Sequence, residues 1–131
     1  MDEKKFIKLP ESELEVMQGI WTLNAEGETN VSAGLIMKRF PRLNRLKLTT
    51  VLTLITRLQL KGFITTEKQG RANCYTPIID AEEYKKFAAE DFLEKVYLGD
   101  KVGAVATILE NGGLTAEECA AVREILDSIK K

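Results

Sequence analysis

The chain has 131 residues and 44% hydrophobic residues, which suffices for one domain, or one domain with an appendage, and a core of its own. No apolar run reaches the roughly 18 residues of a membrane span, and the first residues lack the apolar core of a signal peptide, so we expect a cytoplasmic protein. The net charge is −1 with no histidine, and no nucleophile–base pair or ligand cluster is visible, which argues against an enzyme, a metal site and a cofactor.

Two helices are predicted in the first 40 residues. The first covers about residues 11–23, because Pro10 suits a helix entry and an apolar stripe of Leu14, Met17, Ile20 and Trp21 follows. A short strand is possible near residues 29–31. The second helix covers about residues 32–40, with Ser32 as its cap and Pro41 as its stop.

A third helix is predicted over residues 47–61, in the stretch LKLTTVLTLITRLQLKGFI, and it ends at Gly62. Its inward face is expected to consist of Leu48, Val51, Leu52, Ile55 and Leu58, which follow the i, i+3, i+4, i+7 spacing. A different face carries Thr50, Thr53 and Arg57. Because β-branched threonine is a poor choice for a merely solvated helix face, these threonines favour a contact surface.

A β-hairpin is expected after this helix. Residues 63–67 and 72–78 are β-prone and bracket the turn pair Gln69-Gly70, which places Lys68 and Arg71 at the tip.

Three further helices are predicted between residues 80 and 131. Capping boxes begin at Asp80 and Thr115, and Asp100 caps a helix over residues 101–110. We expect the chain to divide into two domains, residues 1–80 and residues 81–131. The second segment has more apolar residues than a short tail can bury alone, so we expect it to form a dimerisation surface rather than fold back on its own domain. The expected dimerisation residues are Tyr84, Phe87, Phe92, Val96, Tyr97, Val105, Ile108, Leu109, Val122, Ile125, Leu126 and Ile129.

Charge is strongly segregated along the chain. Residues 38–71 carry nine basic groups and one acidic group, whereas residues 1–37 carry three and seven, and residues 72–131 carry seven and twelve. This pattern favours one surface that meets a polyanion over an ordinary solvated run. Phosphate contacts are expected from Lys38, Arg39, Arg42, Arg45, Lys47, Lys61, Lys68 and Arg71.

The order helix, helix, basic helix, hairpin is that of a winged helix-turn-helix, so the fold class is mainly α (α+β) with a C-terminal helical region. A recognition helix buries one face and offers the other to the major groove of double-stranded DNA, where threonines contact phosphate, base edge or thymine methyl. The alternative is a small α+β domain, or a winged helix that docks a protein without sequence-specific DNA binding.

The motifs ELEVMQGIW (13–21), TTVLTLITRLQLKGFI (49–64) and GRANCYTPI (70–78) resemble the penicillinase-repressor family of transcriptional regulators. The resemblance implies a homodimeric repressor on a palindromic operator, with Thr49, Thr50, Thr53 and Arg57 in the recognition helix and Lys68 and Arg71 in the wing.

Two features of that family are missing from the sequence. The segment YLGDKVGAVA has no Asn-Phe cleavage pair, and the end EILDSIKK has no cysteine-rich copper motif, so neither proteolytic regulation nor copper sensing is expected. The releasing signal, and any signalling partner that delivers it, stay open. Cys74 and Cys119 are far apart, and we expect small buried side chains rather than a disulfide.

Overall fold

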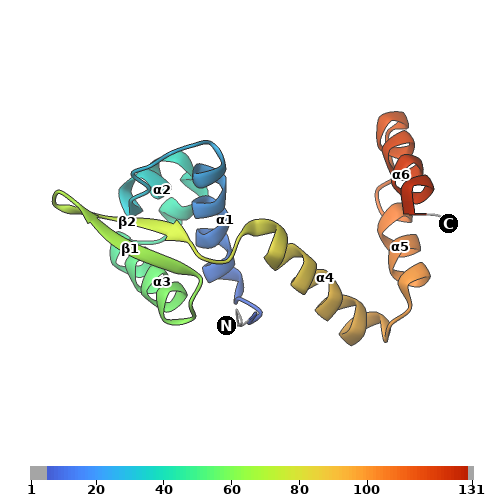
Figure 1. Cartoon of the computed structure of the whole chain (residues 1–131), viewed down its shortest axis with the longest axis horizontal. Helices are drawn as coiled ribbons and strands as arrows, with labels where there is room; N and C mark the ends of the chain where they lie inside the picture. Colours follow the sequence, from blue (N-terminus) through green and yellow to red (C-terminus); the bar gives the residue numbers. More distant parts are fainter. Residues whose placement is uncertain (1–5, 130–131) are drawn as a thin grey trace. The chain divides into compact units, whose positions relative to one another are not determined.

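The computed structural model describes residues 6–129, which form helices and one two-stranded antiparallel sheet in two compact units. The N-terminal unit ends at Ala88. It holds α1 (Glu11–Ala25), α2 (Ala33–Arg39), the 3₁₀ helix η1 (Pro41–Arg45), α3 (Leu48–Leu60), β1 (Ile64–Gln69), β2 (Ala72–Pro77) and the first half of α4 (Ala81–Tyr97). The C-terminal unit holds the rest of α4, α5 (Lys101–Glu110) and α6 (Ala116–Ile129). The predicted mainly helical α+β class is therefore confirmed (Figure 1).

The core lies in the N-terminal unit, where α1, α2 and α3 pack against one another and the hairpin projects beyond them (Figure 1). In α1, Val16, Ile20 and Leu23 are fully buried, at the i, i+4, i+7 spacing of a helix face. Phe63, at the entry to β1, is also fully buried. Among residues 6–129, no helix combines the length and apolar character that crossing a bilayer requires.

The buried face of α3 differs from the predicted one. It consists of Val51, Leu54, Ile55 and Leu58, all at most 5% exposed. Leu48 and Leu52, which were expected to face inward, are 49% and 38% exposed. Val51, Ile55 and Leu58 are therefore buried as predicted, while Leu54 is buried in place of Leu48 and Leu52, so the buried face is rotated about the helix axis relative to the predicted one.

The hairpin was predicted with its turn one residue too early. Gln69 still pairs with Ala72, so the turn residues are Gly70 and Arg71, and Gly70 has a φ of +65°. A positive φ at the first turn residue alone is the type II′ geometry that glycine accommodates best. The short strand considered near residues 29–31 is absent from the described chain, where only the Val31 carbonyl accepts a hydrogen bond (2.8 Å) from the Tyr75 amide of β2.

Helix starts follow the predicted caps. The Ser32 hydroxyl accepts from the Leu35 amide (3.2 Å), and the Asp100 carboxylate accepts from the Gly103 amide (3.0 Å). The capping boxes that begin at Asp80 and Thr115 are reciprocal, with distances of 2.9–3.1 Å.

Tyr84 belongs to the core of the N-terminal unit, which corrects its assignment to the dimerisation surface. It is 5% exposed, its ring lies 5.6 Å from that of Trp21 and 5.7 Å from that of Phe63, and its hydroxyl accepts a hydrogen bond (2.8 Å) from the Leu9 amide. Phe87 is partly buried against the same core, 5.9 Å from the Tyr84 ring. The start of α4 thus packs against the core of the N-terminal unit, and a domain boundary after residue 80 stays a prediction.

Replacing Tyr84 with phenylalanine tests this assignment. The variant leaves the buried Leu9 amide without its acceptor, so we expect the free energy of unfolding to fall by about 1–3 kcal/mol. Urea denaturation followed by Trp21 fluorescence measures the loss. Tyr97→Phe is the matched control, because it removes the same hydroxyl from a tyrosine of the C-terminal unit whose hydroxyl has no hydrogen bond within residues 6–129. A Tyr84→Phe variant that dissociates the protein without losing stability would return Tyr84 to the dimerisation surface.

Candidate nucleic-acid interface

The exposed side of α3 carries the residues predicted to recognise DNA. Thr49, Thr50, Thr53 and Arg57 are all exposed, because the opposite face of the helix packs into the core. The Thr53 hydroxyl donates to the Thr49 carbonyl (3.0 Å), so its oxygen and its methyl group remain available on the surface. In the described part of the chain, no hydrogen bond engages the hydroxyls of Thr49 and Thr50. These two can therefore donate as well as accept.

Basic side chains lie at both ends of this surface. Lys47 occupies the N-cap position of α3, where its side chain makes no capping hydrogen bond. Lys68 pairs with Asn73 near the end of the hairpin, and Arg71 is in the turn. All three basic side chains are exposed, and no ion pair holds them within residues 6–129. They are free to meet phosphates.

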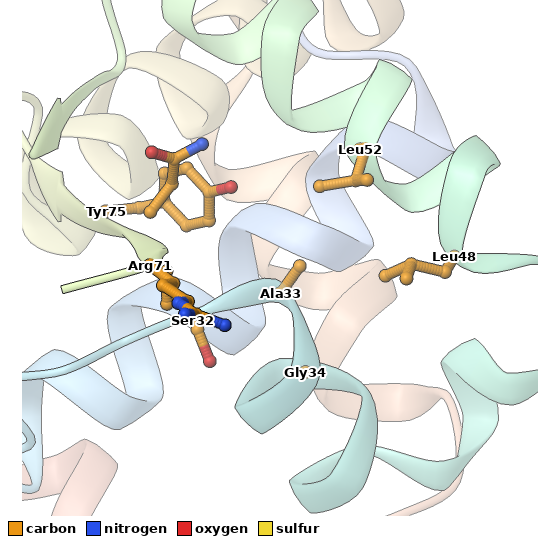
Figure 2. Close-up of a pocket in the computed structure, with 9 residues that line it drawn as sticks. Ser32, Ala33, Gly34, Leu48, Leu52, Arg71 and Tyr75 are labelled. Atoms are coloured by element: carbon orange, nitrogen blue, oxygen red, sulfur yellow. The ribbon is translucent and has the colours of Figure 1, made fainter. Parts of the chain in front are cut away.

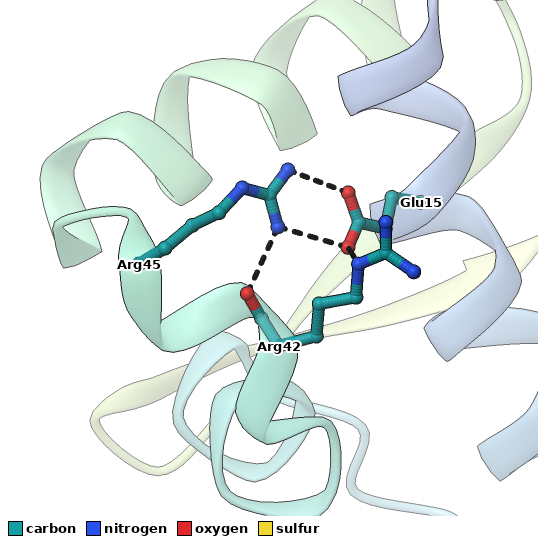
Figure 3. Close-up of polar contacts among 3 residues, drawn as sticks. All are labelled: Glu15, Arg42 and Arg45. Carbon is teal, nitrogen blue, oxygen red and sulfur yellow. Dashed lines mark hydrogen bonds and ion pairs between the residues drawn. The ribbon is translucent and has the colours of Figure 1, made fainter.

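Arg42 and Arg45, by contrast, converge on Glu15 of α1 (Figure 3). The Arg45 guanidinium forms two hydrogen bonds to the Glu15 carboxylate, of 2.7 and 2.9 Å, and the Arg42 Nε lies 3.4 Å from Glu15 Oε2. Arg45 also donates to the Arg42 carbonyl (2.9 Å). The hydrogen bond from Arg45 lowers the pKa of Glu15 below its ordinary value, and the same bond raises the pKa of Arg45. This cluster fixes η1 against α1 and orients both arginines.

Neutralising Glu15 should destabilise the protein slightly and only above acidic pH. A folded-state pKa below the unfolded one means that the carboxylate contributes stability above the unfolded value, about 4.3, and that this contribution disappears as the pH falls through the folded value. We expect Glu15→Gln to lower the free energy of unfolding by up to about 1 kcal/mol at pH 7, because Arg42 and Arg45 are largely solvated.

Urea denaturation of the wild type and of Glu15→Gln at pH 7 and pH 3 measures this difference, which should shrink at the lower pH. Glu82→Gln is the matched control, since Glu82 forms an exposed ion pair with Lys85 on α4. A difference that is the same at both pH values would show that the charge of Glu15 is irrelevant to stability.

Lys61 has a different environment from the one predicted. Its ammonium forms an ion pair with the carboxylate of Glu13, which is 3% exposed, and Lys61 itself is the C-cap of α3. This contact joins the end of α3 to the start of α1. We therefore assign Lys61 to the stability of the fold and leave it out of the candidate interface.

A groove beside the threonine face escaped the sequence-based prediction. It has a volume of about 460 Å³ and lies between the start of α2, the first turns of α3 and the hairpin. Figure 2 shows Leu48 and Leu52 on the α3 side, with Ala33, Arg71 and Tyr75 across from them. The sequence does contain a signal for it: Val51, Leu54, Ile55 and Leu58 also follow the spacing of a helix face, and a helix that buries this face leaves Leu48 and Leu52 exposed.

The C-terminal unit exposes apolar side chains on each of its helices. In α4, Phe92 and Val96 are 47% and 59% exposed, and Tyr97 is partly buried, with its ring 5.5 Å from that of Phe92. The largest exposed apolar residues of α5 and α6 are Val102, Val105, Ile108, Ile125, Leu126 and Ile129, while Leu109 and Val122 are partly buried. Such a surface is unusual for a monomer and is typical of an interface.

Comparisons with known proteins give matches that cover nearly the whole chain. Residues 9–128 match the model of the penicillinase repressor family. The chain is 31% identical over 127 residues to the penicillinase repressor of Bacillus licheniformis, covering 97% of this chain and 95% of that one. It is 32% identical to the penicillinase repressor of Staphylococcus aureus, covering 97% of each chain, and 30% identical to the methicillin resistance regulatory protein MecI of Mammaliicoccus sciuri, covering 97% and 98%.

The fold is also similar to a solved structure. The solution structure of the DNA-binding domain of the repressor BlaI aligns with a TM-score of 0.50 at 30% identity, covering 63% of this chain and 94% of that one. The winged-helix prediction is thereby confirmed. The three sequence motifs, the arrangement of helices and hairpin, and a match that spans both units lead to one conclusion: the chain belongs to the penicillinase repressor family.

Proposed function

We propose that the chain is a homodimeric transcriptional repressor that binds a palindromic DNA operator through α3 and the hairpin, and that operator occupancy blocks transcription. The family supports DNA-binding repression. The observation that carries the proposal is that the exposed face of α3, with Thr49, Thr50 and Thr53, lies within the basic segment 38–71, which has nine basic groups and one acidic group.

Each part of this surface has a distinct role in the proposed complex. The first turns of α3 enter the major groove, where recognition helices contact base edges, and the threonine hydroxyls there meet base edges or phosphates. Lys47, Lys68 and Arg71 contact phosphates on either side. Arg42 and Arg45, which Glu15 orients, present their remaining N–H groups to the backbone of the DNA.

Dimerisation gives the operator its symmetry. Two copies joined through the exposed apolar residues of the C-terminal unit would present two recognition helices, and helix-turn-helix dimers contact half-sites roughly 34 Å apart, or multiples of that spacing. The palindrome follows from the two-fold axis of the dimer. A repressor of this kind works in the cytoplasm, where the chromosome lies, and needs no catalytic residue.

The test starts with the operator itself. Selecting fragments of the host genome on the full-length protein should recover a short palindrome upstream of regulated genes. Gel-shift titration should then show much tighter binding to that palindrome than to a scrambled duplex, with affinity that falls steeply as salt rises. Recovery of no common sequence, or equal binding to both duplexes, would contradict the proposal.

Arg57 distinguishes base contacts from phosphate contacts within this surface. It lies more than two turns along α3, beyond the part that meets base edges in helix-turn-helix proteins, so we assign it to a phosphate. Arg57→Ala should therefore weaken binding to operator and scrambled DNA alike and reduce the salt slope by about 1. A selective loss of about 1–3 kcal/mol on the operator alone would instead make Arg57 a base-reading residue.

The second candidate function is a protein-interaction module built on the winged helix. The basic block between residues 38 and 71 counts against it, since a protein ligand does not require this excess of positive charge. Heparin binding that disappears in modest salt favours the nucleic-acid function. Retention by a protein partner at high salt, without any binding to DNA, favours the alternative.

A further inference from the structure

Two leucines are exposed on the first turns of α3, the part of the proposed interface that enters the major groove. Leu48 is 49% exposed and Leu52 is 38% exposed, although both are large apolar side chains on a helix whose other face is well buried. They are spaced i, i+4, so they stack on one strip of the helix, directly beside the strip of Thr49 and Thr53.

These leucines form the apolar side of the groove in Figure 2. Across the groove, Tyr75 contributes its ring and Ala33 its methyl group, while Arg71 of the hairpin turn lies at the rim. The groove is thus apolar inside and cationic at its edge. Its leucines belong to the N-terminal turns of α3, the turns that meet base edges in helix-turn-helix proteins.

The surroundings identify the class of occupant. A basic residue belongs to each element beside the groove: Arg71 of the hairpin turn lines it, and Lys47, the N-cap residue of α3, directly precedes Leu48. An occupant that brings phosphates to these cations and an apolar group to the leucines matches both properties. In the major groove of DNA, the C5 methyl of thymine is the apolar group that base pairs display.

We propose that Leu48 and Leu52 read thymine methyl groups in each half-site and are specificity-determining residues of the operator complex. This inference rests on the proposed function. It assigns the leucines the hydrophobic part of recognition and leaves hydrogen bonding with base edges and phosphates to Thr49, Thr50 and Thr53.

The methyl group can be removed from the DNA without changing anything else in the duplex. Deoxyuridine pairs as thymidine does and keeps the O4 acceptor, but it has no C5 methyl. The experiment uses the full-length protein and the selected operator, in which each thymine of a half-site is replaced by uracil in turn. At one or two positions, affinity of the wild type should fall about fourfold, the amount expected for one buried methyl group.

The variants Leu48→Ala and Leu52→Ala should each lose the sensitivity at the position that the missing leucine contacts, and bind the thymine and uracil operators equally there. Leu60→Ala is the matched control, because Leu60 is 82% exposed on the same helix but lies at its far end, outside the groove. It should keep the wild-type sensitivity. Trp21 fluorescence verifies that each variant is folded.

Two outcomes would overturn the inference while the proposed function stands. In one, the wild type binds its operator specifically and no uracil substitution matters. In the other, both leucine variants keep the full sensitivity to uracil. Failure to bind any operator is a different result, which would contradict the proposed function itself.

Discussion

Replacing Lys61 with methionine is expected to lower the free energy of unfolding by about 2–3 kcal/mol, a large loss for a surface lysine. The reason is Glu13, whose carboxylate is nearly inaccessible and has the Lys61 ammonium as its ion-pair partner. Without that cation, the carboxylate remains buried and unpaired, which costs more than the pair itself is worth. Because the Lys61 side chain is 28% exposed, water can offset part of the loss, and we place the value below that of a fully buried pair.

Urea denaturation followed by Trp21 fluorescence gives the magnitude. Lys68→Met is the matched control, since Lys68 is exposed and without an ion pair in the described chain, and its loss should stay within about 0.5 kcal/mol. The double variant Glu13→Gln with Lys61→Met should recover part of the stability, because the buried charge is gone. If Lys61→Met is as stable as Lys68→Met, the ion pair has no structural importance, and Lys61 returns to the candidate interface.

The N-terminal ends of four helices could be predicted because their capping signals are local in the sequence. Ser32, Asp80, Asp100 and Thr115 each satisfy backbone amides within three residues of themselves, so the sequence alone contains both the cap and the group that it caps.

The buried face of α3 could be predicted only in part, because two stripes fit the same spacing and share Val51 and Ile55. Residues Leu48, Val51, Leu52 and Ile55 follow i, i+3, i+4, i+7, and so do Val51, Leu54, Ile55 and Leu58. The choice depends on how α1 packs against α3, which is a tertiary contact. Leu48 and Leu52, which remain outside the core, are the residues to which we assign thymine recognition.

Ion pairs between residues far apart in the sequence could not be predicted either. Glu13 and Lys61 are separated by 48 residues, and Glu15 and Arg45 by 30. Charge counts alone made Lys61 and Arg45 equal candidates for phosphate contacts, although one is tied to a buried carboxylate and the other to an exposed cluster. Similarly, apolar spacing along α4 could not show that Tyr84 completes the core of the N-terminal unit.

Replacing Ile125 with glutamate is expected to convert the protein to a monomer and to weaken operator binding by about 10²-fold or more. Ile125 is 60% exposed on α6, beside Leu126 and Ile129, so a carboxylate there costs the free chain little but would be desolvated at a dimer interface. Each half-site complex would lose the gain in effective concentration that comes from two linked recognition helices. It would also have half the phosphate contacts, so the salt slope should fall by about half.

Sedimentation of the full-length variant gives its oligomeric state, and gel-shift titration gives its affinity for the operator. Ala120→Glu is the matched control, because it adds the same charge to α6 on the side opposite Ile125 and should leave both quantities unchanged. Trp21 fluorescence should report the same unfolding of the N-terminal unit in both variants. A dimeric Ile125→Glu protein with wild-type affinity would mean that α6 is outside the interface, and that copies of the chain associate through α4 or α5 alone. A variant that is monomeric yet keeps full operator affinity would mean that each winged helix binds DNA independently, so that the symmetry of the operator would no longer follow from the protein.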